Sequence, residues 1–531
     1  MNRTPVLITG AVILDGDGRP PFPADVVVEE SLIAGVEPPG SVPPDPFEVL
    51  DASGMVVAPG FIDVHSHADN APFLEDADTS KILQGVTTEV VGNCGFSLGP
   101  ALPTHRGELA ELVARFFPPG TPSSPSFTDL LVLSDELGYV TNVAPLVGHH
   151  ALRVGTAGRA ARRPGAQELA AMGDLLREAL DAGAFGLSSG LIYDPGMFAP
   201  PAELTELVAQ LPAGGVYATH VRGEGRQLRQ SVEEALAVAR HTGRAVHISH
   251  LKVAGRPYWG AMPEVLSRID DARRQGHDIR HDVYPYTAGS TVLSALLPPW
   301  VRDGSTEQVL RRLQDPDVVK RLRADLARDG DDWENLAFGS GWENIVIASS
   351  SRGEHDGKSL RHIADELARE PADTLVHLLL TEHLRISMVI HSMCESDLRT
   401  ALVHPQTMIG SDGLPPGARG LPHPRQFGTF PRVLSRYVRE TGLLTLEDAV
   451  RRMTSLPAAA FGLVDRGSVR PGMVADLVAF DPATVQDTAT YTDPIRSPEG
   501  IAWVMLAGRV VARDGRYLGG RHGMRLVPRH P

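Results

Sequence analysis

Cysteine, long hydrophobic runs and an excess of positive charge are all missing from this chain of 531 residues. With only two cysteines, Cys94 and Cys394, no disulfide framework can stabilise it, and a reducing compartment is expected. The apolar stretch near residue 10 is broken by Gly and Asp too soon for a signal peptide or a membrane span. The formal net charge of -15 disfavours a nucleic-acid-binding face. We therefore expect a soluble, cytoplasmic protein with a small-molecule substrate and with neither nucleic acid nor membrane as partner.

The predicted secondary structure changes twice along the chain. Residues 1–58 and 465–531 are rich in β-branched runs separated by Gly and Pro turns, and the two ends are expected to pair into one small β-sandwich domain. Between them, residues 59–464 are long enough for one large catalytic barrel. A charged, mainly helical insertion is expected at about 291–345, late in the barrel.

The central region alternates short apolar strands with helical stretches, a pattern typical of repeated βα units and a parallel sheet. In the clearest helix, over 228–242, apolar residues recur at helical spacing and Gly243 takes the C-cap position. Eight candidate strands are the number that closes a TIM-like (β/α)8 barrel, so the predicted fold class is α/β. They are FIDVHSH, TTEVVGN, NVAPLVG, AFGLSSG, YATHV, AVHISH, IRHDVYPY and TMIGSDG.

Four histidines lie at the C-terminal ends of these strands, where TIM barrels carry their active sites. His65 and His67 are two apart, so the period of a strand points both rings to one side, about 7 Å apart. Such a pair alone is more often two hydrogen-bonded histidines. His220 and His250, however, end two successive strands, and the four together are better explained by metal binding. Zinc suits imidazole best, while iron, nickel and manganese stay open.

Asp412 closes the eighth candidate strand at the same end of the barrel. A carboxylate beside a metal-activated water can take its proton during attack on a carbonyl carbon and return it to the departing nitrogen. A single Asp before Gly could also merely cap a turn, so its role depends on the histidines.

The segments PGFIDVHSHAD, THVRGEG, HISHLK and GSDG resemble the metal-binding signature of the amidohydrolase superfamily, which draws ligands from strands one, five, six and eight. Several superfamily members bridge two metals with a carboxylated lysine of strand four. This chain has only four lysines, and none lies in AFGLSSGLIY. A thiolate is the obvious substitute, and Cys94 at the end of the second strand is placed to supply it, whereas Cys394 fits a small buried hydrophobe.

A cysteine in this place resembles the D-aminoacylase branch of the superfamily, the N-acyl-D-amino-acid deacylases. The resemblance implies one tightly bound Zn2+ held by Cys94, His220 and His250. It also implies a second, weaker metal position that shares the cysteine and is formed by His65, His67 and Asp412.

The resemblance extends over nearly the whole chain, including SGLIYDPG, HLKVAG, DVYPYTAGST and HPRQFGTFPRVL. A guanidinium at Arg425 suits two-pronged binding of the free α-carboxylate of an N-acyl amino acid. The residues that the resemblance assigns to the substrate pocket are Tyr193, Lys252, Tyr284, Ser290 and Arg425.

The predicted reaction is hydrolysis of an N-acyl-D-amino acid to a carboxylate and a free D-amino acid, by zinc-activated water with Asp412 as general base and acid. One alternative is a cyclic-amide hydrolase of the hydantoinase or dihydropyrimidinase type, against which the missing strand-four lysine weighs. Another is a non-catalytic, oligomer-forming relative, against which the six occupied ligand or base positions weigh. The preferred side chain and acyl group, one or two metals, and a monomeric or homo-oligomeric state stay open.

Overall fold

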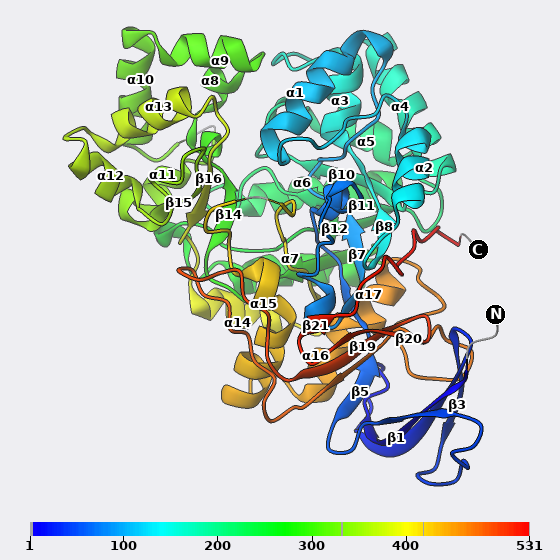
Figure 1. Ribbon diagram of the computed structural model, residues 1–531. Helices are drawn as coiled ribbons and strands as arrows, with labels where there is room; N and C mark the ends of the chain where they lie inside the picture. Colours follow the sequence, from blue (N-terminus) through cyan, green and yellow to red (C-terminus); the bar gives the residue numbers. More distant parts are fainter. Residues whose placement is uncertain (1–3, 331–332, 418, 530–531) are drawn as a thin grey trace.

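The computed structural model describes residues 4–330, 333–417 and 419–529, and its centre is a closed barrel of parallel strands (Figure 1). One ladder runs β6-β7-β8 and the other β9-β10-β11-β12-β13-β17; β8 and β9 are two parts of the third strand, interrupted at Leu146. A parallel bridge between Ser66 and Gly413 joins the first strand to the last. The strands are β6 (Phe61–Asp63), β7 (Val86–Val91), β8 (Asn142–Pro145), β9 (Val147–Gly148), β10 (Gly186–Gly190), β11 (Val216–His220), β12 (Ala245–Ile248), β13 (Ile279–Val283) and β17 (Thr407–Ile409).

These strands correspond to the eight that the sequence predicts, and the barrel fold is confirmed. Because helices cover the outside of the barrel and side chains fill its interior, nearly every residue of these strands is buried, polar residues such as Glu89 and Asp282 included. The first strand is shorter than predicted: β6 ends at Asp63, and His65 and His67 follow it in irregular backbone held by the Ser66 bridge.

Helices between and after the strands form the outer layer. In α6 (Leu228–Thr242) the predicted apolar stripe is buried, and Gly243 ends the helix with a φ of 66°. None of the helices in the described part of the chain is long and apolar enough to cross a membrane. The other outer helices are α1 (Arg106–Phe116), α2 (Phe127–Leu137), α3 (His149–Ala157), α4 (Ala166–Asp181), α5 (Pro201–Val208), α7 (Met262–Arg274), α14 (Glu395–Val403), α15 (Arg425–Arg432), α16 (Leu446–Met453) and α17 (Ser455–Ala460).

The two ends of the chain share one nine-stranded sheet beside the barrel, seen in Figure 1 as blue and red strands. The ends are joined where β5 pairs with β18, and side chains from both bury a common core around Val57, Leu477 and Trp503. The strands are β1 (Val6–Ile13), β2 (Phe22–Glu29), β3 (Leu32–Glu37), β4 (Glu48–Asp51), β5 (Val56–Pro59), β18 (Leu477–Phe480), β19 (Ile501–Leu506), β20 (Arg509–Arg513) and β21 (Arg516–Tyr517).

A separate layer of helices and a small antiparallel sheet lies between β13 and β17 in sequence, coloured green to yellow in Figure 1. The helical insertion expected at about 291–345 lies within it; its exact boundaries stay a prediction. Its elements are β14 (Gly289–Val292), α8 (Pro299–Arg302), α9 (Thr306–Leu313), α10 (Pro316–Leu326), α11 (Leu336–Ser340), β15 (Ile345–Ser349), α12 (Leu360–Glu366), α13 (Pro371–Thr381) and β16 (Ser387–Ile390).

Candidate metal centre

The structure brings all six predicted ligand or base residues together at the carboxyl end of the barrel. His220 is the last residue of β11, and the other five follow β6, β7, β12 and β17 by two to four residues. All six are buried: His65, His67, Cys94, His220, His250 and Asp412. Their convergence follows from the parallel topology, because every strand of such a barrel ends at the same rim.

The thiol of Cys94 lies at the middle of this cluster. Its Sγ is 3.3 Å from His65 Nε2, 3.4 Å from His250 Nε2 and 3.8 Å from His220 Nδ1. A sulfur and three imidazole nitrogens that converge in this way form a donor set that suits zinc. The residues present therefore fit the expected metal.

Three of the six residues have backbone conformations that non-glycine residues rarely adopt. Cys94, His250 and Asp412 have φ angles of 52°, 36° and 50°, in the left-handed region. Each such residue costs about 1–3 kcal/mol and persists only where the surrounding structure imposes it. Strain at three strand ends that face one another indicates that the fold is built to aim these side chains inward.

The aspartate lies on the side of the cluster formed by the strand-one histidines. Asp412 Oδ1 is 3.2 Å from His67 Nε2 and 3.6 Å from His65 Nε2. These three residues form one of the groups whose potential ligand atoms lie within 4.8 Å of one another. They are the residues expected to form the second, weaker metal position.

Two other groups of potential ligand atoms lie equally close together, and their residues differ in part from those expected to hold the tightly bound metal. One consists of His65, Cys94 and His250, and another of His220, His250 and Glu224. Cys94, His220 and His250 are linked through the sulfur but do not form such a group themselves. Which histidine completes the tight position with the cysteine therefore stays a prediction.

The electrostatics favour a thiolate and a neutral imidazole at the centre. Burial alone would raise the pKa of Cys94, but His65 and His250 hold it well below its usual range. Burial, together with Lys252 and His220, lowers the pKa of His250 to about 4. A deprotonated thiol and an uncharged ring are the forms that bind a metal.

Asp412 is held as a carboxylate. Burial would raise its pKa, but Arg425, His250 and His67 hold that pKa well below the usual range. Arg425 Nη1 is 2.9 Å from Asp412 Oδ2. The candidate base is therefore ionised and in contact with the candidate carboxylate-binding residue.

A buried polar network supports the strand-one side of the cluster from behind. Lys81 Nζ lies 3.0 Å from Asp63 Oδ2, donates to Ser411 Oγ at 2.8 Å and is 3.7 Å from Glu89 Oε2. Asp63 Oδ1 in turn accepts the backbone N–H groups of His65 and Ser411. This network connects the first, second and eighth strands where the barrel closes.

Three of the predicted substrate-binding residues lie beside the ligand cluster. The Arg425 guanidinium stacks on the Tyr284 ring at 4.6 Å, and Lys252 Nζ is 5.6 Å from the same ring. Lys252 Nζ also lies 2.8 Å from His250 Nδ1. Within the described residues the buried Tyr284 hydroxyl has no hydrogen-bond partner. A substrate carboxylate placed between Arg425 and Tyr284 would give the Tyr284 hydroxyl a partner and Arg425 one in addition to Asp412 and the Ser290 carbonyl.

The other two predicted residues take part in contacts of their own. The Tyr193 ring is 5.2 Å from the His220 ring, and its hydroxyl accepts a hydrogen bond from Thr291. The Ser290 hydroxyl donates to the carbonyl of Met388, and its own carbonyl accepts from Arg425 Nη2. The Ser290 side chain therefore bonds within the β14–β16 pair, and only its backbone carbonyl contacts a residue of the site, Arg425.

Two carboxylates of the site were missed by sequence reasoning. Asp282, on β13, is 2.6 Å from His247 Nε2 and 3.6 Å from His65 Nδ1. Glu224 lies in the loop after β11, close to His220 and His250. The available signals were an Asp inside IRHDVYPY and a Glu four residues after His220 in THVRGEG.

Cys394 departs from the prediction of a small buried residue. It is partly exposed at the start of α14, and its thiol donates to Asp397 Oδ2 at 3.2 Å. The reason is its place at a helix N-terminus, which the surrounding sequence does not mark as apolar.

Comparison with known proteins gives matches over nearly the whole length. The model of the amidohydrolase family matches residues 48–260 and 376–512. A D-aminoacylase of Alcaligenes xylosoxydans xylosoxydans is 36% identical, covering 99% of this chain and 97% of its own. An N-acyl-D-glutamate deacylase of the same organism is 38% identical, covering 95% and 93%. The crystal structure of N-acyl-D-glutamate deacylase from Bordetella bronchiseptica, complexed with zinc and a phosphonate inhibitor, is 37% identical with a TM-score of 0.82, covering 98% of this chain and 99% of that one.

Proposed function

The chain belongs to the amidohydrolase family and to its branch of D-aminoacylases and N-acyl-D-amino-acid deacylases, and from this premise we propose that it is a zinc-dependent hydrolase of N-acyl-D-amino acids. The products are a carboxylate and a free D-amino acid. The single observation that carries the proposal is the convergence of three imidazole nitrogens on Cys94 Sγ within 3.8 Å, beside an ionised aspartate.

We assign the tightly held zinc to Cys94, His220 and His250, and a second, weaker position to His65, His67 and Asp412 with the cysteine shared. When bound, the metal polarises the acyl carbonyl and lowers the pKa of water to about 7. A ligating thiolate must stay reduced, which is consistent with the scarcity of cysteine and with a reducing, cytoplasmic setting.

The chain's own residues then divide the remaining work. Asp412 accepts the proton of the attacking water and delivers it to the amide nitrogen as the C–N bond breaks. Arg425 binds the α-carboxylate of the substrate in a two-pronged geometry, and the unpartnered Tyr284 hydroxyl donates to the same group. Lys252, Tyr193 and Ser290 complete the wall of the pocket.

A chiral hydrolysis assay tests the proposal. N-acetyl derivatives of D- and L-amino acids with apolar and acidic side chains are incubated with the protein, and zinc content is measured on the same sample. We expect release of the D-amino acids, with zinc bound. Equal hydrolysis rates for the D- and L-enantiomers, or an active sample that contains no zinc, would contradict the proposal.

The same panel includes a hydantoin and a dihydropyrimidine, because a cyclic-amide hydrolase shares the barrel. Faster hydrolysis of either ring would favour that alternative. No lysine is present in β10, where such enzymes carry their bridging residue, which supports the linear amide. A sample that binds no zinc after purification in zinc, and hydrolyses nothing in the panel, would favour the non-catalytic relative.

A further inference from the structure

One oxygen of Glu224 lies beside the outer nitrogens of two candidate zinc ligands. His220 turns Nδ1 toward Cys94 and His250 turns Nε2 toward it. The remaining nitrogens, His220 Nε2 and His250 Nδ1, are 3.3 Å and 3.5 Å from Glu224 Oε1. Glu224 is itself buried. A single carboxylate thus faces both rings from the side opposite the thiol.

This placement bears on which nitrogen of each ring carries the proton. A neutral imidazole binds a metal through one nitrogen only when the proton is on the other. A carboxylate near that other nitrogen attracts the proton and frees the ligand lone pair. Glu224 is placed to do so directly for His220, whose Nε2 has no other partner among the described residues. At His250 the carboxylate is farther from Nδ1 than Lys252 is, and it acts there by opposing the charge of that ammonium.

At His250, the neighbouring Lys252 increases the need for a negative charge near Nδ1. Its Nζ donates to Glu224 Oε1 at 2.6 Å and is 2.8 Å from His250 Nδ1. An ammonium group facing Nδ1 alone would favour a lone pair there and a proton on Nε2, which is the nitrogen turned toward Cys94. Glu224 pairs with the same ammonium, and its negative charge opposes this preference.

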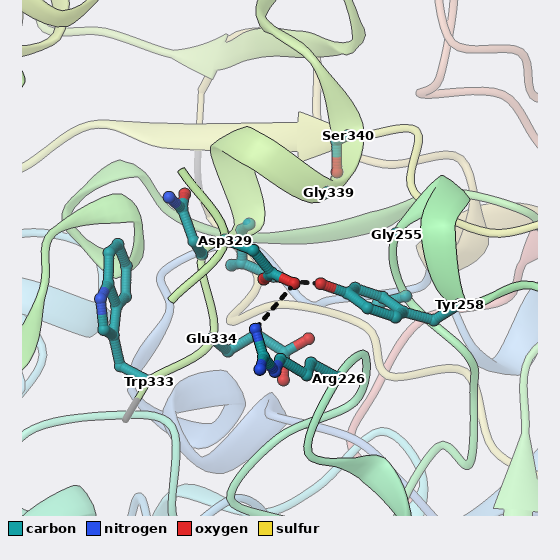
Figure 2. A pocket seen from close by; sticks show the side chains of 11 residues that line it. Arg226, Gly255, Tyr258, Asp329, Trp333, Glu334, Gly339 and Ser340 are labelled. Atoms are coloured by element: carbon teal, nitrogen blue, oxygen red, sulfur yellow. Dashed lines mark hydrogen bonds and ion pairs between the residues drawn. The ribbon is translucent and has the colours of Figure 1, made fainter. Parts of the chain in front are cut away.

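The loop that carries Glu224 is held by the segment between β13 and β17. Glu334 accepts the backbone N–H of Glu224, and a Cβ on Gly223 or Gly225 would lie only 2.7 Å or 2.6 Å from the Glu334 carboxylate oxygens. The glycines of THVRGEG therefore permit the close approach. Figure 2 shows Glu334 in the pocket beside Arg226. The Arg226 guanidinium donates a hydrogen bond to Asp329, which lies in the same inserted segment as Glu334.

We propose that Glu224 is a positioning residue that sets His220 and His250 in their metal-binding tautomers, and that Glu334 holds the Glu224 loop in place. The inference rests on the proposed zinc ligands. It extends the centre from the barrel to the inserted segment, 110 residues along the chain from Glu224.

Zinc affinity of the metal-free protein, measured by competition with a chromophoric chelator, tests this inference. Glu224→Gln is expected to weaken zinc binding by about 10- to 100-fold, as loss of an outer carboxylate does elsewhere. Glu334→Gln acts only through the loop and is expected to weaken it by about 2- to 30-fold. Glu307→Gln, on α9 of the same segment with 80% of its side chain exposed, is the matched control and is expected to bind as the parent does.

A double-mutant cycle separates tautomer control from a merely structural role. If the unopposed ammonium is the cause, Lys252→Met added to Glu224→Gln recovers part of the lost affinity. Glu224→Asp keeps the charge on a shorter side chain and is expected to bind zinc more tightly than Glu224→Gln; it also serves if the Gln variant does not fold, as judged by circular dichroism.

Two results would overturn the inference: zinc affinity of Glu224→Gln within twofold of the parent, or no recovery in the double variant. Failure of the proposed function is distinguishable, because the parent protein would then bind no zinc or release no D-amino acid. A parent that binds zinc and deacylates, with Glu224→Gln unaffected, would contradict the inference alone.

Discussion

The two halves of the candidate centre meet at Cys94 but are supported by different parts of the molecule. Glu224 and Lys252 lie beside His220 and His250. The inserted segment contacts the Glu224 loop through Glu334. On the other side, a network inside the barrel backs His65, His67 and Asp412 where the first and last strands close.

The two halves are expected to differ in metal affinity. The Cys94 side has a thiolate and an imidazole with a pKa of about 4, both in metal-binding form. On the Asp412 side, burial alone would lower the pKa of His67, but Asp412 and Cys94 raise it to about 9. A ring that holds its proton so firmly gives it up to a metal at a cost. The second position is therefore expected to be the weaker one.

The largest effect is expected where both halves are broken together. Cys94→Ala removes the shared sulfur, so zinc content falls and kcat/KM for an N-acetyl-D-amino acid is expected to drop by more than about 10³-fold, corresponding to several kcal/mol of lost charge stabilisation. Elemental analysis and steady-state kinetics measure both. Cys394→Ala, the other cysteine, is the control. Full zinc retention in Cys94→Ala would argue against thiolate ligation.

Asp412→Asn is expected to reduce turnover without removing zinc from the Cys94 side of the centre. Loss of the base lowers kcat by about 10²- to 10⁴-fold, while zinc on the Cys94 side stays bound. The readouts are kcat and the number of zinc ions that resist dialysis. Asp174→Asn, at a side chain that is 68% exposed, controls for the loss of one charge. Near-normal turnover would rule out Asp412 as the base.

Lys81→Met tests the support of the strand-one half. The change leaves Asp63 and Glu89 buried without their cation, and unfolding in urea is expected to show a loss of about 3–5 kcal/mol. Lys320→Met, at an exposed position, is expected to stay within about 0.5 kcal/mol of the parent. If the two variants were equally stable, the network behind His65 would not be needed for stability.

The smallest effect is expected from His67→Asn. It breaks only the weaker position, so protein loaded with excess zinc is expected to hold one equivalent less, while kcat changes by no more than about tenfold, or 1.4 kcal/mol. Equilibrium dialysis gives the stoichiometry. Loss of the tightly bound zinc instead would show that the halves are not separable.

Much of this arrangement was accessible from the sequence. The eight strands carry their own apolar pattern and turn residues, and the ligand types lie at strand ends, so fold class and the six converging residues were predicted. Glu224 was not, because a glutamate in a Gly-rich loop is usually solvated. Its burial depends on contacts with His250, Lys252 and Glu334, which come from other parts of the chain. The role of Lys81 was not predicted for a similar reason: its partners lie on β6, on β7 and in the segment after β17.

The sequence by itself determined the barrel, the family and the chemical types of the candidate ligands, since hydrophobic period and strand-end chemistry are local properties of the chain. Only the tertiary structure decided which carboxylate faces which imidazole and how the inserted segment reaches the centre. Those relations depend on distances of a few ångströms between residues that are far apart in the chain, and no local pattern encodes such distances.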